Sequence, residues 1–155
     1  MINFKLLTFN ELDNGLLYEI LKLRNEIFII EQNCHYLDLD DKDQKSFHLC
    51  GFDNEKLVAY CRILPEGVSY QNYCAIGRVL CHSDFRRKNY GILLMKKAIE
   101  ICNEKFEEPI KLSGQKYLTQ FYLNLGFEIV SEEYLEDDIP HFAFVLQKPN
   151  ANIKN

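Results

Sequence analysis

The sequence predicts a single domain of mixed α/β architecture. A chain of 155 residues suits one hydrophobic core, and 47% hydrophobic with 26% charged residues is an ordinary globular balance. Short strand-like apolar runs also alternate with segments of helical periodicity. We therefore expect one domain over residues 1–147 and a flexible C-terminal tail at 148–155.

The N-terminal segment predicts a strand followed by a helix. Residues 2–9 form a short apolar run, and Asn10 could cap a helix that has Asp13 at its third position. Apolar residues recur at helical spacing between positions 16 and 30. We expect this helix to end near residues 31–33.

The middle of the chain predicts an irregular loop and three strands. Residues 34–45 are polar and acidic, which is typical of a loop. Residues 47–52 and 57–64 predict an antiparallel hairpin with a four-residue turn. A third strand follows at 73–81, and Gly77 inside it indicates a bulge or a close backbone approach.

The C-terminal half predicts two helices and further strands. Residues 91–106 carry apolar side chains at three- and four-residue intervals, which predicts an amphipathic helix. A short strand at 110–112 and a helix at 115–125 follow, and Gly126 is expected to end that helix in a left-handed conformation before another strand. The last strand is expected at 140–146.

Charge and composition exclude several functional classes. A net charge of -5 disfavours a basic nucleic-acid-binding face, and no apolar run or leader pattern indicates a membrane segment or secretion, so we expect a cytoplasmic protein. The six cysteines include no C-x-x-C pair, which argues against a zinc ribbon or a dithiol redox motif. We expect free, mostly buried thiols and no metal.

A basic connector between a strand and a helix is the most informative segment. Arg86, Arg87 and Lys88 precede the helix expected from residue 91. A tight loop at a helix N-terminus offers backbone N–H groups and the positive end of the helix dipole to a phosphate. Spacing alone leaves a solvated surface run as an equal alternative.

This segment resembles the acetyl-coenzyme A signature of the GNAT acetyltransferases. The family core reads Gln/Arg-x-x-Gly-x-Gly/Ala, and residues 86–91 match its first and last positions, with Asn89 where the middle glycine would stand. Asparagine is the non-glycine residue that best tolerates a left-handed backbone. A second block, Gln115 with residues 121–127, resembles the family's late helix.

Other segments are similar to the ElaA-like branch of that family, over roughly residues 4–147. They are Glu31-Gln32-Asn33-Cys34, Asp38-x-Asp40-Asp41, Phe47-His48, Gly77-Arg78-Val79 and Ile139-Pro140-His141. The resemblance implies a GNAT fold, in which a mixed, mostly antiparallel sheet flanked by helices splays open between the strands at 73–81 and 110–113.

The resemblance also implies acetyl-coenzyme A as co-substrate and an amine as acceptor, on a small molecule or a protein. The implied activity is N-acetyl transfer by direct attack in a ternary complex, by a monomer or homodimer. The cofactor would contact Val79, Leu80 and Cys81 through their main chain, the loop and helix start Arg86, Arg87, Lys88, Asn89, Tyr90, Gly91 and Ile92, and Gln115, which could instead cap its helix.

Catalytic roles remain open at several positions. Tyr122 occupies the family's general-acid position but could also be a packed helical tyrosine. The strand at 73–81 has no glutamate to act as base, which leaves Glu31, His48, His141 or a water relay. A non-catalytic acyl-coenzyme A binding module is the alternative function.

Several further residues are candidates for acceptor binding. Arg78 interrupts an apolar strand and could project into the cleft or toward solvent. The acidic loop with Asp38 and Asp40, and the segment Glu136-Asp137-Asp138, could attract a cationic amine if they flank the acceptor groove, and otherwise are solvated loops.

Overall fold

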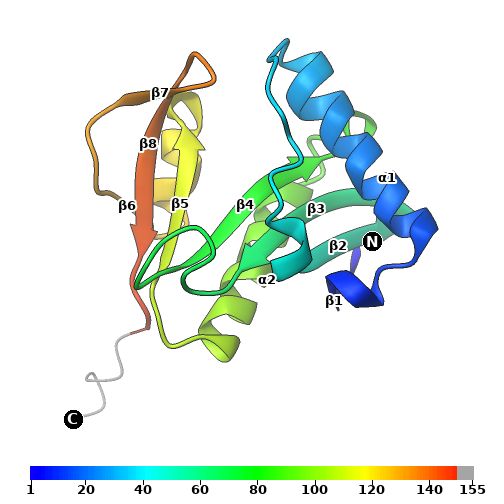
Figure 1. Cartoon of the computed structure of the whole chain (residues 1–155), viewed down its shortest axis with the longest axis horizontal. Coiled ribbons are helices and arrows are strands. Elements are labelled where there is room, and N and C mark those ends of the chain that lie inside the picture. The colour runs from blue at the N-terminus through cyan, green and yellow to red at the C-terminus, as the bar shows by residue number, and fades with distance from the viewer. Residues whose placement is uncertain (150–155) are drawn as a thin grey trace.

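A computed structural model describes residues 1–149 as one mixed sheet flanked by helices (Figure 1). The strand order is β1-β2-β3-β4-β5-β8-β6, and β7 pairs with the outer part of β8. The strands are β1 (Asn3–Thr8), β2 (Phe47–Asp53), β3 (Lys56–Leu64), β4 (Cys74–Cys81), β5 (Ile110–Gln115), β6 (Glu128–Ile129), β7 (Tyr134–Glu136) and β8 (Ile139–Leu146). The α-helices are α1 (Asn14–Arg24), α2 (Tyr90–Lys105) and α3 (Thr119–Asn124).

The sheet opens between β4 and β5, as the resemblance to the GNAT family implies. These two strands run parallel, and only Cys74 with Ile110 and Ala75 with Lys111 are in register. Every other neighbouring pair described is antiparallel. Beyond the two paired positions the strands diverge, which gives the two wings seen in Figure 1.

Two apolar clusters hold helices against the two faces of the sheet. On one face, Leu94, Met95, Ala98 and Cys102 of α2 are fully buried in the main core. On the other face, α1 contributes Ile20 and Leu23 to a second cluster. At about 25 cal/mol per Å² of apolar surface, this burial is the main force that orients both helices.

The first helix begins later than expected. Asp13, not Asn10, is its N-cap, because the Asp13 Oδ1 atom accepts a hydrogen bond of 2.7 Å from the Leu16 N–H. Asn10 instead lies in a short 3-10 turn, Phe9–Glu11. After Arg24 the helix continues as a wider π-helical segment, Asn25–Glu31, so its end agrees with the prediction.

The C-terminal part also differs from expectation. The sequence predicts a helix over 115–125, but strand β5 runs on to Gln115 and a 3-10 turn at Lys116–Leu118 precedes α3. Gly126 has the expected left-handed conformation, with a φ of 100°. Strand β7 was not predicted. It is joined to β8 by a two-residue turn in which Asp137 and Asp138 have φ values of 51° and 64°.

The chain end and the cysteines complete the fold. The Lys148 Nζ atom donates a hydrogen bond of 2.9 Å to the Asn103 carbonyl at the end of α2. The first residue of the expected flexible tail is therefore anchored. Residues 150–155 of that tail lie outside the described part. All six cysteines are free thiols, and all but Cys81 are buried. Within residues 1–149, no helix has the length and apolar character required to cross a bilayer.

Candidate active site

A cavity of about 660 Å³ occupies the opening between β4 and β5. Its wall brings together most residues that the sequence singles out, from segments far apart in the chain. They are Glu31, Arg78, Val79, Leu80, Cys81, Arg86, Arg87, Asn89, Tyr90, Gly91, Ile92, Gln115, Tyr122 and His141. Lys88, Asp38, Asp40 and His48 are not among the residues that line it.

A bulge in β4 frees main-chain groups at the cavity wall. Tyr60 pairs with Leu80 and Arg62 pairs with Gly77, so two β4 residues face a single β3 residue. Arg78 has a φ of 51°, so the left-handed residue is the arginine and not the adjacent Gly77. With β5 diverged on the other side, the main chain near Val79 is available to a ligand.

The basic connector and the start of α2 form an anion-binding arrangement. Arg87 and Asn89 have φ values of 68° and 62°, so Asn89 adopts the left-handed conformation that asparagine tolerates better than other non-glycine residues. The first α2 hydrogen bond runs from the Leu93 N–H to the Asn89 carbonyl, so the preceding N–H groups lack helical partners. No acidic residue lies in this first turn, and Asn89 gives no side-chain cap.

Gly91 leaves the surface beside those N–H groups uncovered. A Cβ atom built at this position would meet only the Cys81 Sγ atom, at 3.8 Å. The fold itself therefore does not require glycine here. The missing side chain keeps the backbone approachable from the cavity, as a pyrophosphate requires.

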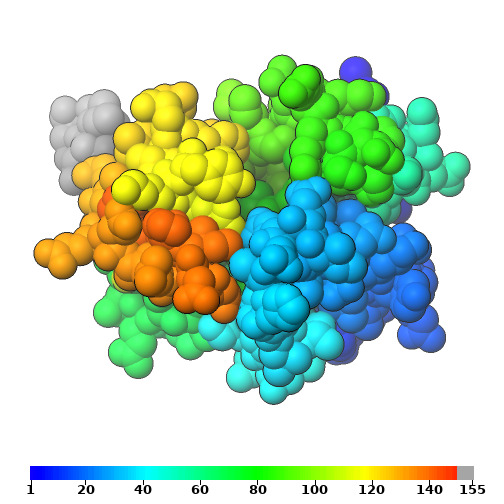
Figure 2. Space-filling view, turned by 90° about the horizontal axis from the view of Figure 1, so that it is seen from above, coloured from blue at the N-terminus to red at the C-terminus, as the bar shows by residue number. Residues whose placement is uncertain are grey.

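Two contacts bridge the two sides of the cleft, Gln115 with Gln32 and Cys34 with Asp137, and a third joins the basic connector to the segment after α1 on one side. The Arg86 Nη2 atom donates 2.7 Å to Glu31 Oε1, and both side chains are partly exposed. The Gln115 amide donates 3.2 Å to Gln32. The Cys34 thiol donates 3.8 Å to the Asp137 carbonyl, where Figure 2 shows the orange β7–β8 hairpin against the light-blue segment after α1.

Tyr122 is held by aromatic packing at the inner wall. Its ring centroid lies 4.9 Å from that of Phe144, and the residue is 5% exposed. Burial raises its pKa to about 12, so the phenol is protonated at neutral pH. Its hydroxyl makes no hydrogen bond to any residue between 1 and 149. Gly114, which the sequence reading missed, gives the ring its space.

Within residues 1–149, two cysteines line the cavity, Cys34 and Cys81. Of these two, Cys34 is buried and Cys81 is partly exposed. Burial raises the pKa of the Cys81 thiol, and the nearby Arg86 only partly opposes this effect. The reactive thiolate is therefore disfavoured.

His48 lies away from the cavity, on the α1 side of β2. Its Nε2–H donates 2.9 Å to the Asp43 carbonyl, and its Nδ1 atom accepts 2.6 Å from the Tyr60 hydroxyl. Burial lowers the pKa of this imidazole, with the Asp43 carbonyl opposing the shift. The structure thus gives His48 a satisfied, neutral position in the interior.

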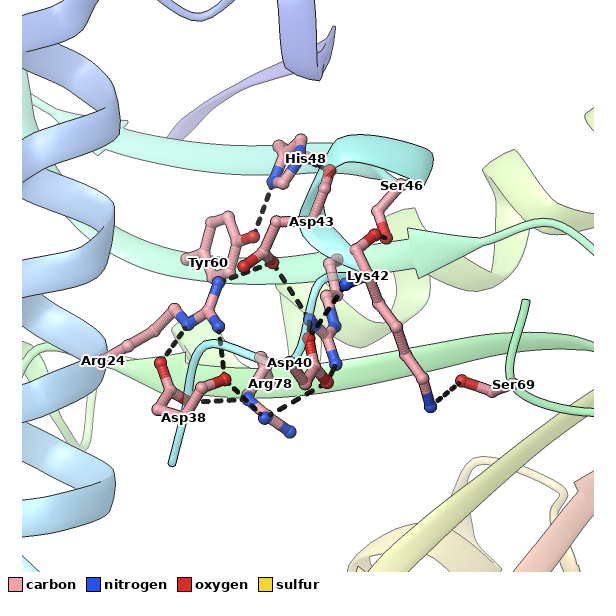
Figure 3. Close-up of polar contacts among 11 residues, drawn as sticks. Arg24, Asp38, Asp40, Lys42, Asp43, Ser46, His48, Tyr60, Ser69 and Arg78 are labelled. Atoms are coloured by element: carbon pink, nitrogen blue, oxygen red, sulfur yellow. Dashed lines mark hydrogen bonds and ion pairs between the residues drawn. The ribbon is translucent and has the colours of Figure 1, made fainter. Parts of the chain in front are cut away.

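The acidic loop folds onto three arginines instead of facing the cavity (Figure 3). Arg24 contacts Asp38 at 2.8 Å and Asp43 at 2.7 Å, and Arg78 contacts Asp38 at 2.7 Å. Arg62 holds Asp40 and Asp43 at 2.5 Å and 3.0 Å. The carboxylates expected to draw in a cationic amine are therefore already compensated.

The energetics of this network favour the ionised pairs. Burial acts to raise the pKa of Asp40, but the hydrogen bond and charge of Arg62 outweigh it and hold that pKa below its usual range. Arg24 is fully buried, and its pairing with Asp43 raises its pKa despite the opposing effect of burial. The network fixes Arg78, and with it the β4 bulge, to the loop and to α1.

A sheet splayed at β4, a bulge there, and a glycine-containing anion loop at the start of α2 define the GNAT class of acyltransferase folds. The chain belongs to this family, because residues 17–127 match the Acetyltransferase (GNAT) family. Its relatives include a UPF0039 protein of Schizosaccharomyces pombe, 41% identical over 90% of this chain and 93% of that protein. Protein ElaA of Escherichia coli is 39% identical over 92% of this chain and 95% of its own length.

Solved structures agree. The crystal structure of Escherichia coli ElaA matches with a TM-score of 0.88 and 37% identity, over 95% of this chain and 100% of that one. An acyl-CoA N-acyltransferase from Pseudomonas aeruginosa matches with a TM-score of 0.88 and 34% identity, over 94% of this chain and 99% of that one. The ElaA-like resemblance and the GNAT fold expected from sequence are confirmed.

Proposed function

We propose that the protein transfers the acetyl group of acetyl-coenzyme A to an amine by direct attack in a ternary complex. One observation carries the proposal: a single cavity has open helix N–H groups at the Gly91 wall and both Tyr122 and His141 among its lining residues. These are the groups that an anionic acyl carrier and an acyl transfer require. In this proposal the protein works in the cytoplasm, as a monomer or homodimer.

The residues of the chain fit an acyl-coenzyme A. Arg86 and Arg87 supply positive charge beside the free N–H groups of Tyr90, Gly91 and Ile92. The main chain at Val79, Leu80 and Cys81, next to the bulge, would hold the pantetheine arm along β4. Gln115 would contribute a hydrogen bond from β5, where it now contacts Gln32.

Three side chains at the cavity wall can move protons. Tyr122 holds its proton at neutral pH and can deliver it to the departing thiolate, whose thiol form has a pKa near 8.5 in an unperturbed setting. Because Tyr122 is the weaker acid, delivery requires the site to stabilise the tyrosinate that forms. Glu31 and His141 both line the cavity as candidate bases, and Glu31 is engaged by Arg86.

Amine-dependent release of coenzyme A thiol tests the proposal. Acetyl-coenzyme A is mixed with the protein and a panel of amines, and free thiol is measured with a chromogenic disulfide. We expect release that depends on both protein and amine, with acetylated amine detected by mass spectrometry. A thermal shift with acetyl-coenzyme A but no release with any amine would favour the non-catalytic binding module instead.

A further inference from the structure

His141 presents an unsatisfied nitrogen to the cavity. The residue is 6% exposed, and its Nδ1 atom lies 2.6 Å from the Ile139 carbonyl. A carbonyl only accepts, so Nδ1 carries a proton, and in the neutral form of the ring Nε2 therefore holds the lone pair. No donor among residues 1–149 lies within hydrogen-bonding distance of Nε2.

The nearest polar atom to that lone pair is itself an acceptor. The Glu136 Oε2 atom lies 3.6 Å from His141 Nε2, and the Glu136 Oε1 atom accepts 2.9 Å from the Ser113 hydroxyl. The Tyr134 ring stacks on the imidazole, with centroids 6.0 Å apart and planes at 25°, and its hydroxyl bonds to Ser113. Ser113 thus holds the Glu136 carboxylate and Tyr134 holds the His141 ring, so Glu136 Oε2 and His141 Nε2 face each other.

When the ring is neutral these two atoms are both acceptors, and a donor placed between or beside them would satisfy both, whereas a protonated ring would itself donate to Glu136. The groups around them add negative charge, since Asp137 follows Glu136 in the same cavity wall. Two cations of the cavity wall are already engaged, because Arg86 pairs with Glu31 and Arg78 pairs with Asp38. A ligand with a positive charge and several N–H donors suits this position.

We propose that Glu136 and His141 form the acceptor site, and that it takes a primary alkylammonium group. One ammonium N–H donates to the Glu136 carboxylate and a second donates to His141 Nε2. The inference rests on the proposed acyl transfer for its catalytic meaning, while the binding itself can be measured separately. It names the class of acceptor and assigns Glu136 a recognition role.

The geometry also supplies the proton path. The His141 Nε2 atom takes one proton from the ammonium group, and the Glu136 carboxylate stabilises the imidazolium that forms. The freed nitrogen lone pair forms a C–N bond to the thioester carbonyl carbon, and the C–S bond breaks with its electron pair leaving on sulfur. The amide nitrogen loses one further proton as the thiolate gains one through Tyr122, and His141 returns its proton to solvent.

Binding is tested by following histidine ring signals by NMR during titration with n-butylammonium chloride. The chain has four histidines, so His141→Gln assigns the signal. We expect butylammonium to shift the His141 signal, n-butanol at equal concentration to leave it unmoved, and Glu136→Gln to weaken binding at least tenfold. Glu128→Gln, an exposed acid on β6 outside the cavity lining, is the matched control and should bind as the wild type does.

Steady-state kinetics separate the sources of the ammonium group. Glu136→Gln should raise KM for butylamine and for a lysine-containing peptide, leave KM for acetyl-coenzyme A unchanged, and spare an arylamine that is neutral at pH 7.5. Whichever of butylamine and the lysine-containing peptide has the lower KM identifies the source of the ammonium group, a small molecule or a protein. An unmoved His141 signal, or equal binding by Glu136→Gln, overturns the inference. Binding as expected without any acetylated product leaves the ammonium site standing and refutes the proposed function.

Discussion

The ring of Tyr122 occupies the space that a side chain at position 114 would need. A Cβ atom built on Gly114 would lie 2.6 Å from Tyr122 Cε2 and 2.9 Å from Phe144 Cε2. Contacts this short do not occur between real carbon atoms, so only glycine lets α3 place this tyrosine against β5. The position of the proposed general acid therefore depends on a residue without a side chain.

Replacing Gly114 by alanine should displace the Tyr122 ring and lower turnover. Overpacking of this kind costs about 1–3 kcal/mol of unfolding free energy, which denaturant unfolding would measure. Gly15→Ala is the control, because the nearest atom to its Cβ would be Asp13 Oδ1 at 3.5 Å and alanine favours a helix. Full activity in Gly114→Ala would show that the ring position is not critical.

Removing the Tyr122 hydroxyl should reduce the rate while coenzyme A binding persists. General acid catalysis contributes on the order of 10²–10⁴-fold, and phenylalanine keeps the packing against Phe144. The measurement is kcat for Tyr122→Phe. Tyr117→Phe serves as the control, because the Tyr117 side chain is 76% exposed. If Tyr122→Phe turns over like the wild type, Tyr122 serves only for packing.

A side chain at Gly91 should block the cofactor without disturbing the fold. Only Cys81 Sγ lies within 4 Å of the missing Cβ, so Gly91→Val should unfold near the wild-type temperature but lose its thermal shift with acetyl-coenzyme A. Asn89→Gly, at a φ of 62°, should bind equally or more tightly. An undiminished shift in Gly91→Val would place the cofactor elsewhere.

Stability should fall as the pH drops through the histidine range. Burial lowers the pKa of His48, so below the unfolded-state value of about 6.5 the unfolded chain binds a proton that the folded chain resists, and unfolding becomes easier. The slope reaches at most about 1.4 kcal/mol per pH unit for one proton.

Urea unfolding at pH 7.5 and 5.5 measures this effect. The lowered pKa values of Asp40 and Asp43 remove stability only as the pH falls below about 3.8, outside that window. His48→Gln should lose part of the pH dependence, whatever its absolute stability. An unchanged dependence in that variant would mean that His48 does not titrate with unfolding.

The strand, loop and helix around the anion site were predictable because each signal is local. Apolar runs define β4 and α2, and Asn89 can adopt the left-handed conformation without distant help. The strand β7 escaped notice because three residues carry no periodicity, although Asp137-Asp138 is a sequence that a two-residue hairpin turn accepts.

The remaining features of the site depend on contacts between distant segments. Arg24 sits on the apolar face of α1, where only its aspartate partners 14 and 19 residues away explain it. Glu136 and Ser113 meet because β7 and β5 both flank β8, a pairing that composition cannot indicate. Gly114 matters through a tyrosine on another element, so its role appears only in three dimensions.

Initial rates with acetyl-coenzyme A and the amine both varied test the central claim most directly. Direct transfer in a ternary complex predicts reciprocal plots that intersect, and no acetylated protein by mass spectrometry when the amine is omitted. The raised pKa of Cys81 agrees with this expectation, since a protonated thiol is a poor nucleophile. Parallel plots with an acetyl group on Cys81 would show a covalent intermediate and contradict the account.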